Sequence, residues 1–175
     1  MIYFTSDTHF GDARVLRIDR RPFSTVPDHD AALISNWNSR VLPGDEIWRL
    51  GDFAVKRAGF AEQLLSQLHG EKYLIIGNND LAETTCATGW ASVQHYAELT
   101  IDGHRLILCH YAFRTCNQMG KGSINLHGHS HGRLKPMPRQ FDLGVDPRSL
   151  RPTTLPELLT KRTRSMQRKD SAHAG

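Results

Sequence analysis

Short apolar runs, separated by polar loops and longer amphipathic segments, dominate the first half of the chain. The apolar runs occupy residues 1–6, 46–50 and 72–76. Runs this short are typical of buried β-strands, whereas the apolar residues of segments 30–41 and 58–68 recur every three or four positions and predict two helices. Residues 10–28 contain one glycine and two prolines and are expected to form a loop. This alternation predicts βαβ units around a largely parallel sheet.

The apolar segments that follow residue 93 are shorter and are typical of strands. They lie at residues 96–101, 105–109, 123–126 and 140–145. Asp102 and Gly103 separate the first two segments and are a pair typical of a hairpin turn. Thr154 with Glu157 three residues later, and Pro156 in the first turn, predicts the start of a final helix.

Length and composition favour a single domain. With 175 residues, of which 39% are hydrophobic, the chain is long enough for one well-buried core and short for two. We expect this domain to span residues 1–160. The whole net charge of +4 arises in residues 161–175. This basic tail can attract a polyanion, but its composition favours a solvated, flexible terminus.

No feature of the sequence predicts export or membrane association. The N-terminus lacks the basic start and small-residue cleavage site of a signal peptide, and no apolar run is long enough to cross a bilayer. The three cysteines are odd in number and lack the spacing of a metal-binding finger, which agrees with reduced thiols. We therefore expect a cytoplasmic protein without a membrane partner.

Several polar motifs follow the predicted strands directly. In Gly128-His129-Ser130-His131-Gly132, the histidines two positions apart can project the same way, which suits a metal ion. A polar surface turn is the alternative interpretation of this run. Asp7-Thr8-His9 offers a carboxylate and an imidazole after the first apolar run, and Asp52 offers a second carboxylate after the second run.

Potential metal ligands therefore stand at the ends of five predicted strands. They are Asp7, His9, Asp52, Asn78, His110, His129 and His131. Open α/β sheets place their ligands at the carboxyl ends of the strands. We expect these side chains to gather at one edge of the sheet, because five separate motifs rich in oxygen and nitrogen donors are hard to explain as coincidence.

The order and spacing of these motifs resemble the calcineurin-like metallophosphoesterase superfamily. The motifs are Asp7-Thr8-His9, Gly51-Asp52, Gly77-Asn78-Asn79-Asp80, His110 and Gly128-His129-Ser130-His131. The resemblance covers about residues 2–146, and the surrounding sequence is similar to small single-domain bacterial and phage members. It implies an α/β fold of two facing mixed β-sheets, a β-sandwich core, flanked by α-helices, with a pair of metals at their common edge.

The resemblance also implies which residues hold the two ions. Asp7, His9, Asp52 and His131 would hold one ion, and Asp52, Asn78, His110 and His129 the other, so that Asp52 bridges. Oxygen and nitrogen ligands without thiolate suit two divalent transition metal ions, with Mn²⁺ expected first and Fe, Zn²⁺ or Ni²⁺ as alternatives. Two such ions turn a bound water into a bridging hydroxide for in-line attack at phosphorus. A structural metal site is disfavoured because such sites are usually saturated by cysteine and histidine.

Position 79 departs from the superfamily pattern, which usually has histidine there. Asn79 cannot act as an acid, but its amide can donate a hydrogen bond to a phosphoryl oxygen. Asn79 is therefore predicted to be catalytic together with Asn78 and Asp52. Branches with another residue at this position resemble phosphodiesterases, so we expect a phosphodiesterase that acts on a nucleotide or nucleic acid.

Two alternatives to this function stay open. One is a phosphomonoesterase, and the other is a catalytically impaired metal-binding scaffold, which Asn79 motivates and the complete ligand set disfavours. Arg14 and Arg114 are candidate phosphate contacts because a guanidinium can hold two oxygens. The alternative, which we favour for each, is an arginine that is solvated on the surface. The chain has no spare length for a capping domain, so we expect an open site, and the sequence leaves the oligomeric state undetermined.

Overall fold

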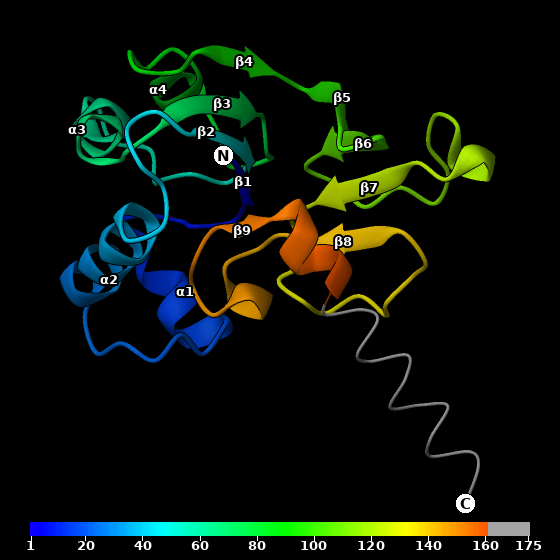
Figure 1. Ribbon diagram of the computed structural model, residues 1–175. Coiled ribbons are helices and arrows are strands. Elements are labelled where there is room, and N and C mark those ends of the chain that lie inside the picture. Colours follow the sequence, from blue (N-terminus) through cyan, green and yellow to red (C-terminus); the bar gives the residue numbers. More distant parts are fainter. Residues whose placement is uncertain (161–175) are drawn as a thin grey trace, which may run out of the picture.

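Three of the predicted apolar runs form neighbouring parallel strands in a five-stranded sheet of the computed structural model, which describes residues 1–160 (Figure 1). They are β1 (Ile2–Thr5), β2 (Glu46–Leu50) and β3 (Glu71–Ile75). The strand order is β4-β3-β2-β1-β9. Tyr3 and Phe4 pack into different apolar clusters on the two faces of this sheet. Strands buried on both faces have continuous apolar sequences, which is why the sequence predicted their positions to within one residue.

The later, shorter segments form a second sheet of four strands. They are β5 (Tyr96–Ile101), β6 (His104–Cys109), β7 (Ile124–His127) and β8 (Gln140–Asp142), in that order across the sheet. The predicted hairpin at Asp102 and Gly103 joins β5 to β6, which are antiparallel. By contrast, β6, β7 and β8 are parallel, and the connections between them contain no α-helix, only the short 3₁₀ turn η1 (Met119–Lys121).

The two sheets face each other across a shared apolar core. The first sheet contributes Phe4, Trp48, Leu50 and Ile75, and the second contributes Leu106, Leu108, Leu126 and Phe141. Helices α2 (Val26–Asn38) and α3 (Phe60–Gln67) cover the opposite face of the first sheet, where Trp37 and Leu64 are buried (Figure 1). The predicted fold class, two facing mixed sheets flanked by helices, is confirmed.

The prediction of a loop over residues 10–28 is wrong. Helix α1 (Ala13–Ile18) lies within this segment, and α2 begins four residues before the predicted start at residue 30. The side chains of Asp12 and Thr25 cap the two helices by accepting backbone N–H bonds. Pro27 lies in the first turn of α2, where a missing N–H costs nothing. Pro27, which suggested a break, therefore marks a helix start, whereas Pro22 lies in the bend between the two helices.

Short edge elements account for the other differences. Helix α4 (Ala82–Thr85) and the strands β4 (Ser92–Gln94) and β9 (Thr153–Thr154) were not predicted, because elements this short depend on the neighbours they pair with. The final helix begins as predicted, with residues 155–160 helical and Glu157 accepting a bond of 3.0 Å from the Thr154 N–H. The expected basic tail at 161–175 lies outside the described residues. Within residues 1–160, no helix is long and apolar enough to span a membrane.

Candidate metal centre

The loops that leave β1 and β2 stay paired beyond the ends of the strands. The Asp7 N–H donates to Gly51 O at 3.0 Å, and the His9 N–H donates to Asp52 O at 3.0 Å. The Thr8 hydroxyl donates to Phe53 O at 2.9 Å. These bonds hold the two predicted carboxylates, Asp7 and Asp52, in adjacent positions at the carboxyl edge of the sheet.

Gly51 lets a third and a fourth segment approach this edge closely. Its φ is +90°, and a Cβ atom there would lie 2.3 Å from His110 Nδ1 and 2.7 Å from the Cα atom of Gly77. Only glycine combines this backbone conformation with so little space. The loops after β2, β3 and β6 therefore converge at Gly51.

Replacing Gly51 by alanine is expected to lower the free energy of unfolding by about 2 kcal/mol or more, through strain at positive φ and overpacking. Urea denaturation of the metal-free protein measures this change. Gly44→Ala is the matched control, because nothing lies within 4 Å of its added Cβ. Equal stability of the two variants would contradict the convergence of the loops at Gly51.

Three predicted ligands form the first group of potential metal donors. Asp7, His9 and His131 each offer a ligand atom, and these atoms lie within 4.8 Å of one another. Asp7 is fully buried, and its carboxylate accepts the His129 N–H at 3.0 Å. Burial, followed by the charge of Asp52, raises the pKa of Asp7 to about 7, against the effect of His131. Burial likewise lowers the pKa of His9 to about 4, although Asp52 opposes this shift.

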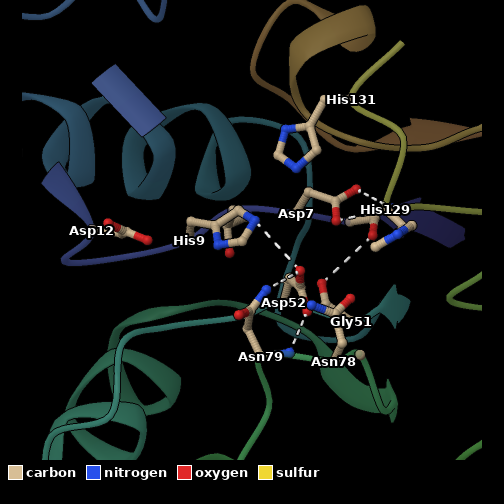
Figure 2. A network of polar contacts seen from close by, with 12 residues as sticks. Asp7, His9, Asp12, Gly51, Asp52, Asn78, Asn79, His129 and His131 are labelled. Carbon is tan, nitrogen blue, oxygen red and sulfur yellow. Dashed lines mark hydrogen bonds and ion pairs between the residues drawn. The ribbon is translucent and has the colours of Figure 1, made fainter. Parts of the chain in front are cut away.

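A second group lies directly beside the first. Asp52, His110 and His129 also offer ligand atoms within 4.8 Å of one another. Figure 2 shows Asp52 between His9 and the asparagines of the loop after β3. One Asp52 oxygen lies 3.5 Å from His9 Nε2, and the other lies 3.6 Å from His110 Nε2. Each oxygen of Asp52 therefore faces a histidine of a different group.

The two asparagines of the loop after β3 complete the cluster. Asn78 Oδ1 lies 2.9 Å from His110 Nε2, so the predicted seventh ligand is beside the second group. Asn79 donates its backbone N–H to one oxygen of Asp52 at 2.9 Å and its side-chain amide to the other at 2.7 Å. The structure thus brings all seven predicted ligands to one edge and places Asn79 against Asp52.

Most of these residues have an unusual backbone conformation. Asp7, His9, Asp52, His129 and His131 have φ values between 49° and 66°, the left-handed region that non-glycine residues seldom occupy. Five of the seven predicted ligands share this feature. Strained backbone of this kind concentrates at functional sites, so it marks this edge independently of the side chains.

Hydrogen bonds at Nδ1 orient two of the histidines. His110 Nδ1 lies 2.7 Å from Leu50 O, and His131 Nδ1 lies 2.8 Å from an Asp146 carboxylate oxygen. Because carbonyl and carboxylate oxygens only accept, Nδ1 carries the proton and Nε2 is left as the ligand atom. Burial alone would raise the pKa of Asp146, but His131 and Arg21 lower it to about 2, so this carboxylate is ionised.

Arg21 links this carboxylate to the ligand loop. Its buried guanidinium donates two bonds of 2.9 Å to the two oxygens of Asp146. It also donates to Asp7 O and Thr8 O, both at 2.6 Å. Sequence reasoning assigned no role to Arg21 or Asp146, because an arginine 125 positions away from its partner gives no local signal.

A second buried arginine lies behind the two groups. Arg49 is fully buried and donates to Gly51 O at 3.0 Å, with its guanidinium 4.7 Å from the centre of the Phe53 ring. Burial lowers its pKa to about 10, and the charges of Asp80, Asp7 and Asp52 oppose that shift. Arg49 therefore stays a cation among three carboxylates. The periodicity of β2 did not reveal it, because an arginine within a strand is usually a surface residue.

The two arginines predicted to contact phosphate are both on the surface. Arg14 follows the cap of α1, and its exposed guanidinium pairs with Asp12 at 2.7 Å. Figure 2 shows Asp12 set apart from the cluster around Asp52. Arg114 is exposed in the connection between β6 and β7. Neither guanidinium has a described contact with the seven ligands.

The donor set fits divalent cations. His9 Nε2 is buried and has no hydrogen-bond partner within residues 1–160. Buried carboxylates such as Asp7 are costly unless a cation is close. A metal ion beside Asp7, His9 and His131 would satisfy both groups, and oxygen with imidazole nitrogen is a donor set typical of divalent transition metals.

Comparisons with known proteins agree with this fold. No family model matches the chain. The structure of AQ665 from Aquifex aeolicus, a protein of unknown function, superimposes with a TM-score of 0.71 at 20% identity, covering 91% of this chain and 98% of that one. YfcE, a phosphoesterase from E. coli, superimposes with a TM-score of only 0.45 at 18% identity, covering 82% and 77% of the two chains, which is too loose to carry an argument.

Two proteins are related in sequence over most of the chain. The uncharacterized protein MJ1445 of Methanocaldococcus jannaschii is 29% identical over 91% of this chain and 89% of its own length. The gene 66 protein of Mycobacterium phage D29 is 30% identical over 83% of this chain and 87% of its own length. Identity of this extent along both sequences shows common descent, and the chain belongs to the family of the phage D29 gene 66 protein.

Proposed function

We propose that this protein is a metal-dependent phosphoesterase with two metal sites. Asp7, His9, Asp52 and His131 would hold one ion. Asp52, Asn78, His110 and His129 would hold the other. The observation that carries the proposal is the position of Asp52, whose two oxygens face His9 and His110 at 3.5 and 3.6 Å. A carboxylate between two donor groups is the arrangement that a bridging ligand requires.

When bound, two divalent ions would supply an activated water nucleophile and neutralise the charge of a phosphoryl group. The residues of the chain orient this chemistry. Leu50 O and Asp146 hold His110 and His131 through Nδ1, which leaves Nε2 of each as the ligand atom. Asn79 anchors Asp52 through two hydrogen bonds. Arg49 supplies a permanent buried positive charge behind the carboxylates.

We propose phosphodiesters of nucleotides or nucleic acids as substrates. The side chain at position 79 supports this choice, because an amide cannot protonate the leaving oxygen of an alkyl monoester. Asn79 is exposed at the edge of the cluster and can also donate to a phosphoryl oxygen. Asn78 is exposed beside it and would take part in the same way.

The test compares hydrolysis of bis(4-nitrophenyl) phosphate and 4-nitrophenyl phosphate by the protein with added Mn²⁺, together with its metal content by mass spectrometry. We expect two metal ions per chain and faster hydrolysis of the diester. Faster hydrolysis of the monoester would favour the phosphomonoesterase alternative. Two bound ions without hydrolysis of either ester would contradict the enzymatic proposal and favour a metal-binding scaffold.

Replacing Asn79 by histidine is expected to raise the ratio of monoester to diester hydrolysis by about tenfold or more, since general acid catalysis contributes about 10²–10⁴-fold where the leaving group needs a proton. The monoester is a nucleoside 5′-phosphate, whose alkoxide leaving group has this need. Asn79→Ala is the control that removes the amide without adding an acid. Unchanged rates on both ester classes in Asn79→His would refute this account of position 79.

A further inference from the structure

The connections from β6 to β7 and from β7 to β8 are basic segments that contain no acidic residue of their own. Residues 111–141 contain no aspartate or glutamate. They contain five basic residues, all exposed: Arg114, Lys121, Arg133, Lys135 and Arg139. Outside the C-terminal segment the charges of the chain cancel, so this stretch concentrates positive charge that the composition as a whole conceals. We call residues 111–123 and 128–139 together the basic loop surface.

This surface begins at the proposed metal sites. Since β6, β7 and β8 are parallel, both connections leave the sheet at its carboxyl edge, directly after His110 and around His129. They then return alongside each other, because Arg139 donates to Met119 O at 3.1 Å and Gln140 donates to Phe113 O at 2.7 Å. Figure 1 shows both connections beside β7 and β8. The basic loop surface is therefore continuous with the metal centre.

Most of its charge is not neutralised by residues 1–160. Arg133 forms an ion pair with Asp19. The other four basic residues form no ion pair with any residue of 1–160. Glu98, on the neighbouring strand β5, accepts hydrogen bonds from Asn117 of this surface at 2.9 and 3.1 Å, and its charge is offset by an ion pair with Arg105 at 3.0 Å. Several cations without an ionic partner on two adjacent connections suit a polyanion with several phosphates.

Exposed apolar side chains interrupt the basic residues. Tyr111 is 46% exposed, and its ring lies 4.9 Å from the ring of His129 and 5.1 Å from that of His110. Leu134 and Met137 are also exposed, on the other connection. Rings beside positive charge are the combination with which proteins bind unpaired bases, because bases stack on them while the cations follow the backbone. In a duplex the bases already stack on one another and are not free to do so.

We propose that the basic loop surface binds single-stranded nucleic acid, with one base stacked on Tyr111 beside the metal centre and the following phosphates near Arg114, Lys135 and Arg139. This inference rests on the proposed phosphodiesterase function and names its substrate class. A mononucleotide would contact Tyr111 but would leave the distant cations without a partner.

The experiment measures binding apart from catalysis. Fluorescence anisotropy follows a labelled oligo-dT of about twelve nucleotides, a length within the range that single-strand sites cover, with phosphorothioate linkages that resist hydrolysis and with Mn²⁺ present. We expect Tyr111→Ala to weaken binding about tenfold and Tyr111→Phe to leave it nearly unchanged, because stacking needs the ring and not the hydroxyl.

The double variant Arg114→Gln/Arg139→Gln is expected to reduce the slope of log K against log salt by about 1.4, because each phosphate of a single strand that the protein neutralises adds about 0.7 to that slope. The control Arg57→Gln/Arg151→Gln removes two exposed charges outside the surface and is expected to keep the slope. The inference is overturned if the wild type does not bind the strand, if a duplex binds as tightly, or if both double variants behave alike.

Failure of this inference is distinguishable from failure of the proposed function. Hydrolysis of bis(4-nitrophenyl) phosphate without strand binding would overturn the inference alone. Strand binding that depends on Tyr111, without hydrolysis of any ester, would support the surface and contradict the enzymatic proposal.

Discussion

Replacing Asp52 by asparagine is expected to lower phosphodiester hydrolysis by about a thousandfold, equivalent to about 4 kcal/mol of transition-state stabilisation. The two oxygens of Asp52 face His9 and His110, one each. Asparagine keeps the shape of the side chain but removes its charge and turns one oxygen into a donor. One of the two donor groups would then lose its shared ligand.

The hydrogen bonds at Asp52 increase the effect. The backbone N–H and the side-chain amide of Asn79 donate to different oxygens of Asp52. An amide at position 52 has a single acceptor oxygen, so one of these donors would face another donor. We therefore expect the Asp52→Asn variant to retain fewer than two metal ions per chain.

Hydrolysis, metal content and thermal unfolding together test this prediction. Asp102→Asn is the matched control, since Asp102 is exposed in the hairpin between β5 and β6 and its φ of 50° is one that asparagine tolerates. We expect this control to keep full activity. Wild-type rates in Asp52→Asn would show that Asp52 does not bridge two metals.

Replacing Arg21 by methionine is expected to lower the free energy of unfolding by about 3–5 kcal/mol, the usual cost of removing one partner of a buried ion pair. Asp146 would keep its negative charge and lose two hydrogen bonds of 2.9 Å. Two backbone carbonyls, Asp7 O and Thr8 O, would also lose their donor. Methionine is long and flexible enough to fill the space, so the loss is electrostatic more than steric.

The same change is expected to weaken metal binding about 10–100-fold, because Arg21 supports the proposed metal ligands through its hydrogen bonds to Asp146 and to the backbone of Asp7. Asp146 orients His131 through Nδ1, and without Arg21 this carboxylate is less firmly held. Arg21 is therefore a positioning residue. A reduced metal affinity in folded protein separates this role from a purely structural one.

Urea denaturation and metal titration measure both effects. Arg17→Met is the matched control, because Arg17 is exposed on α1 and close to Arg21 in sequence. Arg21→Lys is expected to recover part of the stability, since it restores the charge but not the paired hydrogen bonds. If Arg21→Met and Arg17→Met have the same midpoint and the same metal affinity, Arg21 does not support the site.

Short apolar runs alone were enough to place the three central parallel strands. β1, β2 and β3 lie between two apolar layers, so most of the residues that point either way are apolar, and such runs are visible in one dimension. The candidate ligands could be predicted for a related reason. They follow strand ends, and parallel strands bring their carboxyl ends to one edge whatever the details of the loops. Asp7 and Asp52 are the clearest examples.

The tertiary structure alone decided how the ligands are held. Arg21 and Asp146 are 125 positions apart and meet only in the folded chain, and Arg49 is buried although its sequence context is that of an ordinary strand. The left-handed backbone of His129 and His131 depends on bonds to distant segments, such as the His129 N–H to Asp7. Local sequence encodes which residues are buried and which secondary structure they favour. Charge pairing and backbone strain depend on which distant segments meet in the folded chain.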